Sequence, residues 1–281
     1  MQFLVDGLLI GFVYGIAAMG LTLIWGVMNV INLAHGPIIA LGMFGVYLLL
    51  NIFGINPYLG LLFVVVAGLL TGMIIYAVAI NRVIDAPHLS SLLATFAINM
   101  IIIGIGTAVF TTTPRNIDMG LGSFQIGSVT IQWTRMIAAI ASVLIAGVLY
   151  LFLYRTTTGK YVRAVANNRA AAELMGIPSR RILALSFGLG TLLAGVAGGL
   201  IATIFPFNIL SGGVYELKSF VIVVLGGLGN PLGSLVGGLI LGLLEGGIPA
   251  FLETTWVPVF EFVLFVIILL VRPQGILGAK K

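Results

Sequence analysis

The sequence contains no cysteine and very few charged residues. Lys and Arg number 13 and Asp and Glu number 8 among 281 residues, which makes 7% charged, whereas a soluble domain carries about 25%. The absence of cysteine excludes disulfides and thiol catalysis. The scarcity of charge excludes a soluble enzyme and a disordered chain. It also excludes a nucleic-acid-binding protein, because a net charge of +5 spread over so few charged residues forms no basic patch.

What the sequence does contain is long apolar runs rich in glycine. Hydrophobic residues make up 60% of the chain, and there are 38 glycines. No Asp, Glu, Lys or Arg occurs in residues 7–81, 89–114, 136–154, 182–215 or 219–244. A membrane-spanning helix needs about 20 such residues, and the runs lack the alternation of a membrane β-barrel. The sequence therefore predicts an all-α polytopic membrane protein.

Glycine, asparagine and proline residues divide these runs into segments. We predict spans at residues 5–27, 35–51, 58–80, 91–111, 134–154, 182–204 and 256–271, and a helical hairpin at 217–250 that is interrupted at 226–231. The hairpin either spans the membrane twice or enters it and returns. The prediction is therefore about eight to nine transmembrane or re-entrant helices in a single transmembrane domain, residues 1–281.

The few charged residues orient the predicted bundle. One topology puts ten of the 13 basic residues on the same face: Arg82, Arg155, Lys160, Arg163, Arg169, Arg180, Arg181, Arg272, Lys280 and Lys281. By the positive-inside rule that face is cytoplasmic. We therefore expect the N-terminus outside, and both the C-terminus and the loop 155–181 in the cytoplasm.

Six of the eight acidic residues then fall at or near the outer side. They are Asp6, Asp118, Glu216, Glu245, Glu253 and Glu261. We expect Glu216 and Lys218 to be solvated loop charges, as are Arg115 and Asp118, and we expect Glu261 to reach the outer interface. For Glu245 two alternatives stay open. It either reaches the outer interface as well or has a functional role, because an ionisable group at membrane depth is often functional.

The chain carries no motif for chemistry of its own. It has no Walker A triplet for ATP, no G-x-S-x-G nucleophile elbow, and no acidic cluster beside its two histidines, His35 and His88. We expect a path for solute rather than an enzyme, with no metal site and no cofactor in this chain. Glycine and asparagine interrupt apolar runs at 26–37 and 226–233. At membrane depth such backbone must be buried in protein or line a wet cavity; the alternative is an ordinary turn at the membrane face.

The basic loop predicts one short helix. Asn168 is a good N-cap, residues 169–175 are good helix formers, and Gly176 suits the position just after a helix. A helix of about two turns is too short to be stable alone, so it needs a docking surface. Leu174 and Met175 beside basic residues suit a groove on a cytoplasmic partner; the alternative is a connector that rests on lipid headgroups.

Three stretches of the sequence are recognisable. They are GLTLIWGVMNVINLAHGPIIALGMFGVY at 20–47, RAVANNRAAAELMGI at 163–177 and FVIVVLGGLGNPLGSLVGGLILGLLE at 220–245. Together they resemble the LIV-type permeases of branched-chain amino acid ABC transporters, and the length resembles that of the shorter of the family's two permeases. The resemblance implies a multi-pass protein of the bacterial or archaeal cell (inner) membrane that moves branched-chain or other hydrophobic amino acids into the cytoplasm.

The resemblance also implies partners and site residues. The partners are a second permease in a homo- or heterodimer, two cytoplasmic ATPases that hold ATP and Mg, and an extracytoplasmic substrate-binding protein. The loop helix would couple to the ATPases through Arg163, Asn168, Arg169, Ala171, Ala172, Glu173, Leu174, Met175 and Gly176. Related importers carry an EAA-x3-G pattern there, and this chain has Ala170 in place of the glutamate, so Arg163 or Arg169 is the candidate for the charge contact.

An apolar solute needs a mostly apolar path with a few polar groups. The candidates for that path are Asn29, Asn32, His35, Asn99, Gly227, Gly229, Asn230 and Glu245; His35 could equally cap the start of the second span. Other functions stay open: an importer of an amide or urea-like solute, a passive channel, or a secondary transporter. A secondary transporter usually needs carboxylates in mid-span, which residues 7–81 lack, and a passive channel needs no capped loop helix.

Overall fold

The computed structural model describes residues 1–272 and 274–278, so Lys280 and Lys281 lie outside the described residues. Its helices are α1 (Gln2–Met28), α2 (His35–Phe53), α3 (Pro57–Ile75), α4 (Asn81–Val83), α5 (His88–Phe110), α6 (Trp133–Arg155), α7 (Thr157–Asn167), α8 (Arg169–Leu174), α9 (Ser179–Ala202), α10 (Gly212–Gly226), α11 (Pro231–Gly247) and α12 (Val257–Val271). A π-helical turn, Tyr76–Ile80, joins α3 to α4, and 3-10 turns at Ile248–Ala250 and Thr254–Trp256 join α11 to α12. Strands β1 (Ser123–Ile126) and β2 (Val129–Gln132) form an antiparallel hairpin.

Within the described residues, eight helical segments are long and apolar enough to cross a membrane. The predicted spans are confirmed to within a few residues, because their ends carry local signals. Gly54 ends α2 with φ 65°, Pro57 is the first residue of α3, and Asn56 caps that helix by accepting a hydrogen bond from Tyr58 N (2.9 Å). The β1–β2 hairpin was not expected. It turns at Gly127 (φ 61°) in the polar loop between α5 and α6, and its strands are far shorter than a span.

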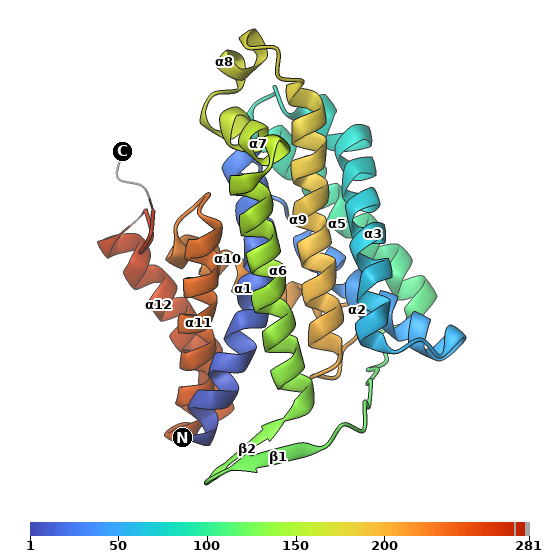
Figure 1. Ribbon diagram of the computed structural model, residues 1–281, viewed down its shortest axis with the longest axis vertical. Coiled ribbons are helices and arrows are strands. Elements are labelled where there is room, and N and C mark those ends of the chain that lie inside the picture. Colours follow the sequence, from blue (N-terminus) through green and yellow to red (C-terminus); the bar gives the residue numbers. More distant parts are fainter. Residues whose placement is uncertain (273, 279–281) are drawn as a thin grey trace.

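The bundle has two distinct ends (Figure 1). The N-terminus and the β1–β2 hairpin lie together at one end, where Gln2 Nε2 donates to the Thr130 carbonyl oxygen (2.6 Å); we call this the hairpin end. Helices α7 and α8 lie at the other end, which we call the loop end. The segment after α12 also lies there, since Ile276 N donates to the Leu225 carbonyl oxygen (2.8 Å) near the end of α10.

Helices α1 and α9 form the buried centre. In the most apolar window of each helix, 78% of the residues are buried in α1 and α9, but only 11% in α5. Glycines let the central backbones meet: Gly11 of α1 packs against Gly238 of α11, and Gly42 of α2 packs against Gly195 of α9. In lipid the hydrophobic effect does not drive helices together, so their association depends on close backbone packing of this kind. The apolar outer faces of α3 and α5 are left for lipid or for other subunits.

Two helices begin inside the bundle rather than at one of its ends. His35, the first residue of α2, bonds to Ala17 midway along α1 (Nε2 to O, 3.0 Å). The backbone of Gly212, the first residue of α10, packs against that of Gly36. Helix α10 has 15 residues, about 22 Å at 1.5 Å per residue, and runs from this point to the loop end. The predicted hairpin at 217–250 therefore consists of a half-length helix, α10, that starts in mid-bundle and reaches the loop end, followed by one full span, α11, that returns.

Candidate functional site

The chain between α1 and α2 is irregular, and side chains of α5 donate hydrogen bonds to two of its backbone carbonyl oxygens. Helix α1 stops at Asn29, whose φ is 52°. Thr95 Oγ1 then donates to the Ile31 carbonyl oxygen (2.9 Å), and Asn99 Nδ2 donates to the Leu33 carbonyl oxygen (2.7 Å). Non-helical backbone at membrane depth is tolerated only where such partners exist. Residues 30–34 of the interruption are therefore buried or partly buried in protein, whereas Asn29 at its start is exposed.

We call the region where the α1–α2 segment meets α5 the junction. It holds three buried polar atoms without a partner. Asn32 and His35 are both 0% exposed. Asn32 Oδ1 accepts from Ala34 N (3.1 Å), and His35 Nε2 donates to Ala17 O (3.0 Å), so His35 binds α1 and does not cap α2. A carbonyl oxygen can only accept, which leaves His35 Nδ1 as a free acceptor. Within the described residues, Asn32 Nδ2, His35 Nδ1 and Asn99 Oδ1 have no hydrogen-bond partner.

Glu216 belongs to this junction, and the expectation of a solvated loop charge is wrong. The residue is 8% exposed, and its carboxylate packs against Gly36 at the start of α2, since a Cβ added to Gly36 would lie 2.6 Å from Glu216 Oε2. In the part of the chain that the structure describes, Glu216 forms no ion pair. The N-termini of α2 and α10 both meet here, and their positive dipole ends favour an anion. The junction thus joins three predicted path residues, Asn32, His35 and Asn99, to one that was missed.

Lys218, Glu245 and Glu261 form a second cluster, between α10, α11 and α12. Lys218 Nζ lies 2.5 Å from Glu245 Oε2 and 3.4 Å from Glu261 Oε1, and Tyr14 OH donates to Glu245 (3.3 Å). Glu261 is 5% exposed, so it does not reach the outer interface as expected, and the side chain of Lys218, 12% exposed, is not the solvated loop charge that was expected. The reason is pairing, because a charge buried with its counter-charge avoids most of the cost of desolvation alone. Glu245 is therefore placed in an ion-pair cluster, away from the junction of α2 and α10.

The remaining path candidates lie at the loop end. Gly229 packs against Gly26 near the end of α1, and Gly227 adopts φ 105°. Asn230 caps α11, and its Nδ2 donates to the Leu277 carbonyl oxygen (2.9 Å). Beside them is a cavity of about 470 Å³, whose lining includes Thr22, Trp25, Asn29, Arg163, Asn167 and Gly229. The path candidates therefore fall into a mid-depth group and a loop-end group, and the loop-end cavity also touches α7.

Helix α8 is the short helix that the loop sequence predicts. Asn168 caps it, accepting a hydrogen bond from Ala171 N through Oδ1 (3.0 Å). Gly176 follows the helix with φ 81°, and Ile177 N donates to the Ala172 carbonyl oxygen (3.0 Å). These are the features of a Schellman ending. The EAA-like spacing thus corresponds to a helix closed at both ends by local hydrogen bonds.

Helix α7, which precedes it, was not expected. Thr156 caps it with its side chain, and Val162 and Val165 are buried on one face. Two valines among basic residues were too weak a periodic signal. Arg163 of α7 lies over the Tyr154 ring, with Cζ 4.5 Å from the ring centroid. One candidate for the charge contact with an ATPase is therefore already packed against α6.

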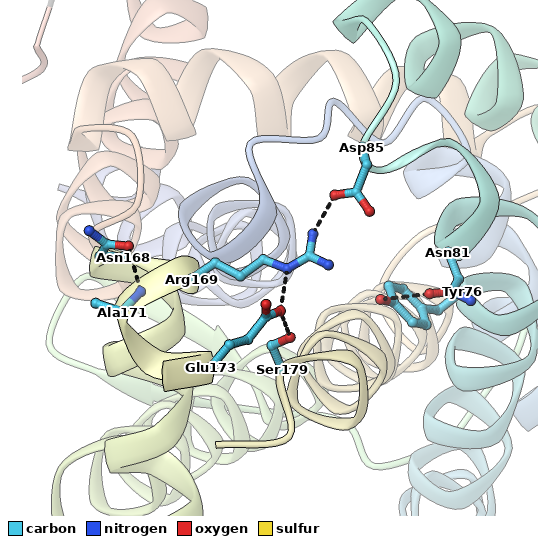
Figure 2. Close-up of polar contacts among 8 residues, drawn as sticks. All are labelled: Tyr76, Asn81, Asp85, Asn168, Arg169, Ala171, Glu173 and Ser179. Carbon is cyan, nitrogen blue, oxygen red and sulfur yellow. Dashed lines mark hydrogen bonds and ion pairs between the residues drawn. The ribbon is translucent and has the colours of Figure 1, made fainter. Parts of the chain in front are cut away.

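Arg169 forms an ion pair that joins α8 to the segment after α4 (Figure 2). Its Nη1 lies 2.7 Å from Asp85 Oδ1, just after α4, and its Nε lies 3.1 Å from Glu173 Oε1. Ser179, the first residue of α9, donates to the same Glu173 carboxylate. The Ser179 hydroxyl and then the Arg169 guanidinium lower the pKa of Glu173 from its usual value. Asp85 and Ser179 were missed, although Asp85 is the one acid in the short segment 81–88 between two predicted spans.

The apolar tip of α8 is left uncovered. Leu174 is 89% exposed and Met175 is 83% exposed, while Ala172 on the opposite side is buried. Leu174 and Met175 therefore form a small exposed apolar surface at the end of α8. The structure thus brings the eight predicted coupling residues of 168–176 together on one projecting helix, and it places Arg163 on α7.

Comparison with known proteins places this architecture in a family. A family model described as branched-chain amino acid transport system / permease component matches residues 3–271. The high-affinity branched-chain amino acid transport system permease protein LivH of Salmonella typhimurium is 32% identical, over 99% of this chain and 95% of LivH. BraD of Pseudomonas aeruginosa, a permease protein of the same description, is 29% identical, again over 99% of this chain and 95% of the relative.

The fold also has a solved counterpart. The structure of PsaBC from Streptococcus pneumoniae in complex with Fab matches with a TM-score of 0.52 at 18% identity, covering 98% of this chain and 93% of that chain. At that identity the likeness concerns the fold alone. The family model, by contrast, spans nearly the whole sequence and agrees with a bundle of eight candidate membrane-spanning helices among the described residues. The chain therefore belongs to the family of permease components of branched-chain amino acid transport systems, and it is a multi-pass membrane protein.

Proposed function

We propose that this permease imports branched-chain or other hydrophobic amino acids in a complex driven by ATP. LivH and BraD are permease proteins of high-affinity branched-chain amino acid transport systems, which supports this class of substrate. The partners would be a second permease in a homo- or heterodimer, two cytoplasmic ATPases that hold ATP and Mg, and an extracytoplasmic substrate-binding protein. The energy source lies on those ATPases, and the chain itself serves as the solute path in one transmembrane domain.

The observation that carries the proposal is the uncovered tip of α8. Leu174 and Met175 project from a helix that Arg169 holds to Asp85 and Glu173. An apolar tip of this kind suits a groove on a partner. Because the helix is braced, movement of the ATPases would be passed on to α9 and the α4 segment rather than lost in a loose loop. The bundle would then switch between inward- and outward-facing states.

Transport inward requires the loop end to face the cytoplasm. Basic residues support this orientation, because Arg82, Arg155, Arg169, Arg180 and Arg272 all lie on elements that end there, as the positive-inside rule expects. The N-terminus, at the hairpin end, would be outside. Substrate would arrive from the binding protein at the hairpin end and leave through the cavity beside α7.

Single cysteines test this orientation directly, since the natural sequence has none. Asn167 and Asp118 are both exposed, at the loop end and the hairpin end respectively. A cysteine at 167 should react with an impermeant maleimide only from the cytoplasmic side, and a cysteine at 118 only from outside. The same cytoplasmic labelling is predicted for position 281, which lies outside the described residues. The reverse pattern would contradict both the orientation and the role of α8.

Uptake by the whole complex tests the substrate. Proteoliposomes with both permeases and the ATPases, with ATP on the ATPase side and the binding protein on the other, should accumulate leucine. Urea and acetamide serve as matched probes of the alternative substrate class and should not accumulate. Leucine uptake without ATP would favour a passive channel or a secondary transporter. Uptake of urea but not leucine would contradict the proposal that the substrate is an amino acid.

A further inference from the structure

Glu216 is a buried carboxylate whose charge is not balanced by any cation in the described part of the chain. It is 8% exposed, and its carboxylate packs against the backbone of Gly36. By contrast, the buried Glu261 and the partly buried Glu245 share Lys218. Burying an unpaired charge is costly, and inside a membrane protein such a group is usually functional. The N-termini of α2 and α10 stabilise a negative charge here only in part, so the carboxylate still lacks a cation among the described residues.

The position of Glu216 on α10 gives a ligand access to it. On a helix, residues three and four apart share a face, so Glu216 follows both Gly212 and Gly213 in the preceding turn. Gly212 packs against the backbone of Gly36, whereas a Cβ at Gly213 would have nothing within 4 Å. Leu217, the next residue along α10, is 53% exposed. The carboxylate therefore lies at the border between a packed face and an open apolar one.

The junction is rich in acceptors. Of its three partnerless buried atoms, His35 Nδ1 and Asn99 Oδ1 accept hydrogen bonds and only Asn32 Nδ2 donates. An ammonium group has three N–H donors and a positive charge. A carboxylate without a cation suits such a group better than it suits an uncharged amide or urea. The single free donor suits the carboxylate end of an amino acid.

We propose that Glu216 binds the ammonium group of the transported amino acid at the junction of α2 and α10, and that the substrate reaches it across the open face at Gly213. The inference rests on the proposed function, and it names the part of the substrate that the permease itself recognises. An aliphatic side chain would then lie along the exposed apolar face of α10.

Removal of the charge at constant side-chain size is the first test. Glu216→Gln keeps the size of the side chain but removes the charge, and Glu216→Asp keeps the charge. In the reconstituted complex Glu216→Gln should lower leucine uptake by roughly 10- to 100-fold, the effect of losing a hydrogen bond to a charged group, while ATP hydrolysis and assembly persist. Glu216→Asp should retain part of the uptake. Glu253→Gln is the matched control, because Glu253 is exposed, and it should transport normally.

Protection of a cysteine at position 213 is the second test, and it does not depend on turnover. In the complex, Gly213→Cys should react with a maleimide, and both leucine and 3-methylbutylamine, an ammonium without a carboxylate, should slow that reaction. 4-Methylpentanoate, which lacks the ammonium, should not. Adding Glu216→Gln to Gly213→Cys should abolish the protection by the amine.

The proposed function and the role of Glu216 are contradicted by different results. If wild-type complex does not import leucine, the proposed function is wrong. If it does, and Glu216→Gln imports at the wild-type rate, the charge of Glu216 does not bind substrate and the inference is overturned. Equal protection of position 213 by the amine and by 4-methylpentanoate would overturn it as well.

Discussion

Replacing Leu174 and Met175 together with aspartate should detach the permease from its ATPase subunits while leaving the bundle folded. The two side chains are 89% and 83% exposed, so they contribute little to the stability of the chain itself. Burying one such side chain in an interface contributes about 1.5–3 kcal/mol. Losing both, and placing two charges there instead, should weaken association by about 100-fold or more.

Co-purification with the ATPases and ATP-driven leucine uptake both measure this effect. Leu121→Asp is a matched control, because Leu121 is a 40% exposed leucine in the loop before β1; it should leave ATPase association unchanged. The single variants Leu174→Asp and Met175→Asp should fall between the wild type and the double variant. If the double variant binds the ATPases as tightly as the wild type, α8 is not the contact, and the reading of residues 168–176 as a coupling helix fails.

Gly42→Ala should remove most of the folded protein from the membrane, although it adds a single methyl group. A Cβ at Gly42 would lie 2.0 Å from the carbonyl oxygen of Gly195 and 2.6 Å from its Cα. These are backbone atoms of a buried helix, so no side chain can move aside and α2 must separate from α9. Overpacking in a tight core typically costs about 1–3 kcal/mol and occasionally more. The contact of two backbones puts this variant at the upper end of that range.

Gly104→Ala isolates the steric effect. Both glycines lie within helices, α2 and α5, so the gain in helix propensity of about 1 kcal/mol is the same for each. A Cβ at Gly104 has nothing within 4 Å. Gly104→Ala should therefore keep or raise the thermal midpoint measured on detergent-solubilised protein, whereas Gly42→Ala should lower it strongly. Equal midpoints for the two variants would show that α2 and α9 are not in backbone contact.

Features encoded by neighbouring residues could be predicted from the sequence. The charge-free runs indicated the spans, since a charge is expensive inside a bilayer wherever the helix packs. Asn168 and Gly176 predicted the ends of α8, because a cap and a left-handed residue act on backbone atoms only a few positions away. The family resemblance rested on the same continuous stretches, and it was confirmed by a model that matches residues 3–271.

Features that join distant residues could not be predicted in this way. Glu216 resembled the charge of a solvated loop, because it stands two residues from Lys218 and at the end of an apolar run. In the structure, Lys218 instead forms ion pairs with Glu245 and Glu261, and Glu216 packs against Gly36. In the same way, Asp85 was unremarkable until Arg169 lay 2.7 Å from it.

By itself, the sequence determined that this chain is a helical membrane protein with a capped loop helix of a recognisable family. It did so because hydropathy and helix capping act over short stretches of chain. Only the tertiary structure decided that α2 and α10 both begin in mid-bundle and that their N-termini meet around Glu216. The cause is packing between helices: Gly36 and Gly212 lie far apart in the sequence, and their contact depends on every helix that holds the two backbones together.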